Sequence, residues 1–96
     1  MGISGSSEGI AEEVKKYVFY RDNWHCRNCN NSNGLDPHHV IFRSAGGKDR
    51  PNNLLTLCRQ CHDDIHAGRI VLKVVEIKQY DLIVEFWRKP NGLTEL

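Results

Sequence analysis

The stretch LCRQCHDDIH, residues 57–66, brings two thiols and two imidazoles close together along the chain. Cys58 and Cys61 form a CxxC pair, and His62 and His66 follow at a spacing of four residues. Side chains four apart share one face of a helix, so both imidazoles can bind one ion, although a solvated helix face has the same pattern. Because Gly68 is a typical helix stop, we predict a short helix that carries donor side chains.

A second CxxC pair lies upstream, at Cys26 and Cys29, with 28 residues (30–57) between the pairs. Two such pairs can complete a tetrahedral Zn²⁺ site of four thiolates, which is closed and therefore structural. The spacing exceeds the roughly 15–20 residues of a zinc ribbon by the length of a hairpin and its loop. A redox pair or two disulfides are the alternatives, but two matched pairs in a reducing compartment favour zinc.

Length and composition indicate one small domain that needs such a staple. The chain has 96 residues, 40% hydrophobic, with a formal net charge of +1, so no strong basic field predicts a nucleic-acid partner. No apolar run is long enough to span a membrane, and residues 1–9 lack the apolar core of a signal peptide. We expect a flexible leader over 1–9, a single domain over 10–96, and a cytoplasmic location in a bacterial or phage-infected cell.

The remaining elements follow from periodicity and turn chemistry. Apolar residues at helical spacing predict a helix from Ile10 to about Arg21. The run at 35–42 predicts a strand that starts after Pro37, and 54–58 predicts a second strand, with a turn-rich loop over 43–53 between them. Residues 70–77 favour a strand, whereas 82–88 fit a strand or a helix equally. The expected core includes four aromatic residues: Trp24, Phe42, Phe86 and Trp87.

The segment from Arg21 to His66 resembles the HNH endonuclease family. The resemblance rests on RDNWHCRNC (21–29), LDPHHVIFRSAGG (35–47), RPNNLLTLCRQCH (50–62) and the HxxxH spacing of the helix. It implies an α+β fold, a small zinc-stapled domain with a ββα-metal finger over about 36–68, preceded by a helix and followed by a β-rich tail. It also implies cleavage of DNA to 5′-phosphate and 3′-hydroxyl ends.

The resemblance also implies roles for individual residues. His38 would hold the catalytic metal together with His62, and His66 would be a further ligand found only in some members. His39 would be the general base, and Asn53 would orient it. Asp36 is a weaker candidate ligand than His38. Neighbours on a strand point to opposite faces, so His38 and His39 need a distortion near Pro37, or a position at the strand edge, to serve one phosphate.

The chemistry of these side chains agrees with that reading. An imidazole titrates near neutral pH and can take a proton from water, while a divalent ion can neutralise charge on the phosphoryl group. Mg²⁺ or Mn²⁺ is the expected ion in the cell, whereas an all-imidazole site favours Ni²⁺ or Zn²⁺. Candidate phosphate contacts on DNA are the cations around the motif: Arg21, Arg43, Lys48 and Arg50.

Two rival functions stay open from the sequence. The first is a non-catalytic zinc module that binds DNA or protein, in which the histidines would be incidental polar residues. A redox switch built on the CxxC pairs would lose zinc and form disulfides under mild oxidation. The chain has little room for a recognition domain, so a homodimer or a protein partner would supply specificity. His25, next to Cys26 in the first knuckle-like loop, is expected to be structural or solvated.

Overall fold

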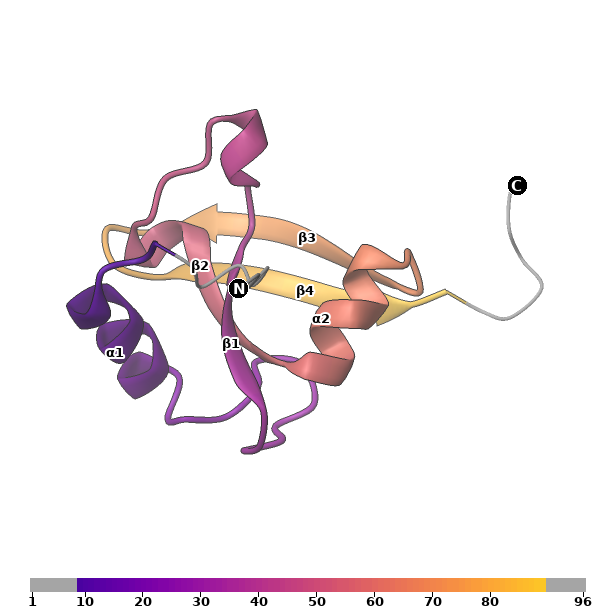
Figure 1. Cartoon of the computed structure of the whole chain (residues 1–96). Helices are drawn as coiled ribbons and strands as arrows, with labels where there is room; N and C mark the ends of the chain where they lie inside the picture. The colour runs from indigo at the N-terminus through magenta and orange to yellow at the C-terminus, as the bar shows by residue number, and fades with distance from the viewer. Residues whose placement is uncertain (1–8, 90–96) are drawn as a thin grey trace.

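The computed structural model describes residues 9–89, in which two helices and two β-hairpins form a mixed α+β domain (Figure 1). The predicted leader lies outside the described residues except for Gly9, as does the end of the chain after residue 89. No helix within residues 9–89 is long and apolar enough to cross a membrane. The elements, in chain order, are α1 (Glu12–Arg21), β1 (Leu35–His39), the short 3-10 turns η1 (Arg43–Ala45) and η2 (Pro51–Asn53), β2 (Leu54–Cys58), α2 (Arg59–His66), β3 (Ile70–Ile77) and β4 (Leu82–Arg88).

The first hairpin pairs β1 with β2 in antiparallel register, so that His39 lies opposite Leu54 and Leu35 opposite Cys58. The strand begins at Leu35, and the prediction that it starts after Pro37 is therefore wrong. Pro37 lies inside β1, opposite Thr56. A two-stranded sheet consists only of edge strands, where a proline is tolerated because it need not donate to a neighbour.

The second hairpin settles the ambiguity of residues 82–88, which form a strand. β3 pairs with β4 through a turn over 78–81, and a bulge shifts the register between Val74 and Glu76. Leu82 is buried and Phe86 is half-buried, while Ile83 and Trp87 between and beyond them are exposed. This alternation has the period of a strand with one covered face, which the apolar pattern alone did not separate from a helix.

Two small apolar clusters make up the core. Ile10 and Val18 pack with Leu54 where α1 covers β2, and Cys26, Cys58 and Cys61 form the second cluster around Leu57. The expectation that Trp24, Phe42 and Trp87 lie in the core is wrong, since 50%, 45% and 48% of their surfaces are exposed. Only Phe86 of that set packs against the cysteine cluster.

Buried carboxylates tie these layers together. Asp64 of α2 accepts hydrogen bonds from Arg69 before β3 and from Arg88 of β4, and these two arginines lower its pKa to about 2. Asp22 after α1 binds Arg21 and Arg27 and accepts the backbone N–H of Thr56 on β2. Asp22 thus ties α1 to the first hairpin, and Asp64 ties α2 to the second hairpin.

Candidate active site

The four cysteines meet in one cluster between the loop after α1 and the start of α2. Their sulfur atoms all lie within 4.8 Å of one another, and Cys29 Sγ is 3.6 Å from Cys58 Sγ. Two thiolates bound tetrahedrally to zinc at about 2.3 Å would lie about 3.8 Å apart, so the spacing fits. Backbone N–H groups of Asn28 and Cys61 donate to Cys26 Sγ and Cys58 Sγ, as in a turn that presents thiolates to an ion.

The chemistry of the donor set also fits a cation. Burial, together with the neighbouring thiols of Cys58 and Cys26, raises the pKa of Cys61 well above the ordinary thiol range. Packed thiols resist deprotonation because their negative charges would repel each other in a medium of low dielectric. A bound divalent cation removes this obstacle, and the cluster can therefore hold a structural zinc ion.

Three histidines form a second donor cluster, which joins β1 to α2. One ring nitrogen each of His38, His62 and His66 lies within 4.8 Å of the others, and His62 Nε2 is 3.2 Å from His66 Nε2. Two ligands at about 2.1 Å from a tetrahedral ion would lie about 3.4 Å apart. His38 is buried and His66 is exposed, so the cluster is closed toward the core and open toward solvent.

The histidine cluster is electrically suited to bind a cation. Burial, followed by repulsion from His62 and His66, lowers the pKa of His38 to about 3. Burial and the neighbouring His66 also lower the pKa of His62, whose Nδ1 is buried without a hydrogen-bond partner. These shifts favour the neutral form of the His38 and His62 rings, which is the form that ligates metal. Three imidazoles leave further coordination positions for water or a phosphate oxygen.

His39 is the last residue of β1, at the edge of the strand, and its ring meets the loop between the strands. Its Nε2 lies 2.7 Å from Asp49 Oδ1, and the carboxylate of Asp49 is also bound by Arg43. The Arg43 guanidinium lowers the pKa of Asp49, so the carboxylate is ionised and can only accept hydrogen bonds. Nε2 of His39 therefore carries the ring proton. Because the ring makes no other hydrogen bond within residues 9–89, Nδ1 remains as an acceptor.

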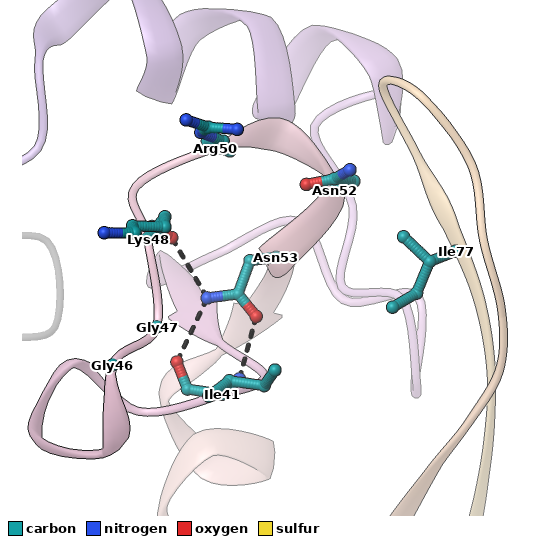
Figure 2. A pocket seen from close by; sticks show the side chains of 8 residues that line it. All are labelled: Ile41, Gly46, Gly47, Lys48, Arg50, Asn52, Asn53 and Ile77. Carbon is teal, nitrogen blue, oxygen red and sulfur yellow. Dashed lines mark hydrogen bonds between the residues drawn. The ribbon is translucent and has the colours of Figure 1, made fainter.

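Asn53 holds this loop in place, and its side-chain hydrogen bonds go to the loop backbone and not to the His39 ring. Its Oδ1 accepts the N–H of Ile41 at 2.8 Å, and its Nδ2 donates to the carbonyls of Ile41 and Lys48, both at 3.0 Å (Figure 2). Gly47 allows the loop to fold so tightly, since an added Cβ there would lie 1.7 Å from the Ile41 carbonyl oxygen. Asn53 thus fixes both ends of the segment that leads to Asp49.

The expected phosphate contacts separate into different environments. Arg21 is only 9% exposed at its side chain and binds Asp22 and the carbonyls of Pro51, Leu54 and Tyr80. These contacts occupy the donors of Arg21 inside the fold, which disfavours Arg21 as a contact for DNA. Arg43 is bound to Asp49, whereas Lys48 and Arg50 line a surface concavity near Asn53.

Two residues near the site had no signal in the sequence. Asp49 sits in a turn-rich loop with no spacing rule that pairs it with His39. Phe42 was expected in the core, but its ring stacks on His66 at a centroid distance of 5.4 Å and meets the edge of His38 at 6.1 Å. Asp36 lies 3.7 Å from Arg59 and outside the histidine cluster.

Comparison with known proteins supports a nuclease or DNA-binding role. The HNH endonuclease family model matches residues 26–68. Over 73 residues the chain is 32% identical to the type IV methyl-directed restriction enzyme EcoKMcrA of Escherichia coli (strain K12), covering 67% of this chain and 26% of that enzyme. Over 63 residues it is 30% identical to anaredoxin of Nostoc sp., covering 65% of this chain and 83% of that protein. No solved structure matches the chain.

The matched segment contains every element of the site described above. It begins at Cys26, includes both hairpin strands and the loop with Asp49, and ends just after α2. The chain spans only about a quarter of the restriction enzyme but most of anaredoxin. The chain belongs to the HNH endonuclease family.

Proposed function

We propose that this protein is a metal-dependent DNA endonuclease that hydrolyses phosphodiester bonds to 5′-phosphate and 3′-hydroxyl ends. The observation that carries the proposal is that two consecutive histidines of β1 have different partners. His38 joins His62 and His66 in a donor cluster, and His39 forms a pair with an ionised carboxylate. These are the parts that hydrolysis of a phosphodiester requires, a site for a cation and an oriented base.

In this proposal His39 is the general base. Its Nε2–H is held by Asp49, so Nδ1 accepts a proton from a water molecule as the water oxygen attacks phosphorus. The bond from phosphorus to the 3′-oxygen breaks, and the leaving oxygen takes a proton from solvent. A divalent ion bound by His38, His62 and His66 would neutralise charge on the phosphoryl and leaving oxygens. Mg²⁺ and Mn²⁺ are the proposed ions in the cell, and Ni²⁺ and Zn²⁺ suit the imidazole donors.

Asn53 and Asp49 act together on the base. Asn53 pins the loop backbone at Ile41 and Lys48, and the next residue, Asp49, contacts the ring. Asn53 therefore orients His39 indirectly, through the loop. A carboxylate that fixes the tautomer of an imidazole is a recurring arrangement in hydrolases.

Plasmid nicking with Mg²⁺ or Mn²⁺ tests the proposal. His39→Ala should lower the cleavage rate by about 10²–10⁴-fold, the usual contribution of a general base, with the zinc content and melting temperature retained. Asp49→Asn should lower the rate by roughly 10–100-fold, as for other groups that orient a functional imidazole. Cleavage by His39→Ala at the wild-type rate would refute the role of the base.

The same measurements address the rival functions. A non-catalytic module would bind a DNA duplex or a protein partner and show no nicking by the wild type with any of the four ions. A redox switch would release zinc and form disulfides under mild oxidant, since Cys29 Sγ and Cys58 Sγ are 3.6 Å apart. Specificity through a homodimer or partner protein, and a location in the bacterial cytoplasm, remain predictions.

A further inference from the structure

A concavity lies beside the candidate active site, between the loop over 41–53 and the tip of the β3–β4 hairpin. Its volume is about 240 Å³, and eight residues line it. In Figure 2 the loop supplies Lys48 and Arg50 on one side, and Ile77 at the end of β3 faces them from the other. This volume is below that of a typical small-molecule pocket, so it suits a fragment of a larger ligand.

The charge of the concavity is unbalanced. Two of its eight lining residues, Lys48 and Arg50, are cations, and none is a carboxylate. Every other arginine in residues 9–89 forms an ion pair with an aspartate, whereas Arg50 has none. Neither the Lys48 nor the Arg50 side chain has a hydrogen-bond or ion-pair partner among the described residues. The concavity therefore offers two unpaired positive charges to an anion.

The same loop faces both the concavity and the active site. Lys48 and Arg50 line the concavity, while Asp49 between them binds His39. Ile41 also lines the concavity, while the next residue, Phe42, stacks on His66 of the histidine cluster. An anion in the concavity would thus lie across this loop from the proposed site of cleavage, and Asn53 fixes the loop.

We propose that this concavity binds a backbone phosphate of the DNA strand that flanks the scissile phosphate, with the adjoining sugar against Ile41 and Ile77. The inference rests on the proposed function, because it assumes that the scissile phosphate occupies the histidine cluster. Half-exposed apolar side chains beside two unpaired cations suit a sugar–phosphate unit, which has one anionic group next to a largely apolar sugar ring. Contacts of this kind position the strand without reading its sequence.

Binding of a fluorescent DNA duplex, followed by anisotropy as a function of salt, tests the inference. All variants carry His39→Ala so that the duplex stays intact. Arg50→Gln and Lys48→Gln should each raise Kd by roughly three- to tenfold and reduce the slope of log Kd against log salt by about 0.9, the value for one lost phosphate contact. Lys73→Gln is the matched control, since it removes an exposed charge from β3 away from the concavity.

A second pair of variants tests the location apart from the cations. Ile77→Glu places a carboxylate in the concavity and should weaken binding as much as Arg50→Gln does. Ile83→Glu makes the same change at another exposed residue of the hairpin and should weaken binding less. Equal slopes of log Kd against log salt for Arg50→Gln, Lys73→Gln and the His39→Ala parent would overturn the inference. If the wild type still nicks DNA in that case, the proposed function stands. Absence of both DNA binding and nicking would overturn both.

Discussion

The two donor clusters share helix α2 but meet solvent differently. Cys58 and Cys61 lie in the apolar core with Cys26, where four sulfurs leave no coordination position for a substrate. His62, the residue after Cys61, lies with His38 and the exposed His66 in the second cluster. These three histidines supply only three donors. Consecutive residues of α2, Cys61 and His62, therefore belong to a closed site and an open site, and the closed site anchors the helix that carries the open one.

Removal of a cysteine from the closed site should have the largest effect on the stability of the fold. Cys58→Ala removes a thiol that is 2% exposed and leaves two buried thiols, Cys26 and Cys61, beside the exposed Cys29. Structural zinc contributes about 10–16 kcal/mol in zinc-finger peptides, which exceeds the stability of most small domains. We expect an unfolded protein, measured by circular dichroism and zinc content. A cooperative melt with wild-type zinc stoichiometry would contradict the structural role of the cluster.

The matched change at the open site is His62→Ala, which should leave the melt of the zinc-loaded protein nearly intact. His62 is half-buried and is not a member of the apolar cluster that contains the cysteines. This variant serves as the control for Cys58→Ala, because each removes one donor, Cys58 just before α2 and His62 within it. Unfolding by both variants would show that the two clusters are equally structural.

The elements that the sequence predicted well are those with strong periodicity or a defined end. The helix over 10–21, the strand at 54–58 and the helix closed by Gly68 are confirmed, with Gly68 at φ +80°. Asp49 and Phe42 could not be predicted, because their contacts depend on the path of the loop. That path is set by a side chain that binds two backbone segments, Asn53, and by a close backbone approach at Gly47.

The next largest effect should be a loss of folding stability at acid pH, caused by His38 of the open site. His38 has a pKa of about 3 in the fold against 6.5 for an ordinary histidine, so the folded state holds it neutral. Its contribution to stability is complete above pH 6.5 and is lost as the pH falls toward 3, because the unfolded chain binds the proton first. Between pH 7 and 5 the loss is about 2 kcal/mol for the protein with zinc on its cysteines and no second metal.

Urea unfolding at several pH values measures this loss, and His38→Gln is the control. The glutamine cannot titrate, so the difference in unfolding free energy between the two proteins isolates the imidazole from the other acidic groups. Parallel curves for wild type and His38→Gln between pH 7 and 5 would show that His38 is not held neutral by the fold.

The smallest expected effect concerns the aromatic ring at the rim of the open site. Phe42 is 45% exposed and stacks on His66 with an interplanar angle of 15°, which restricts the one solvent-exposed ligand of the cluster. A stacked pair contributes about 0.5–1.5 kcal/mol, so Phe42→Leu should weaken binding of the second metal by roughly two- to tenfold. Phe42→Tyr keeps the ring and should bind as wild type, measured by calorimetry with Ni²⁺ or Mn²⁺. If Phe42→Leu binds metal as tightly as Phe42→Tyr, His66 is either held by α2 alone or is not a ligand, and the open site reduces to His38 and His62.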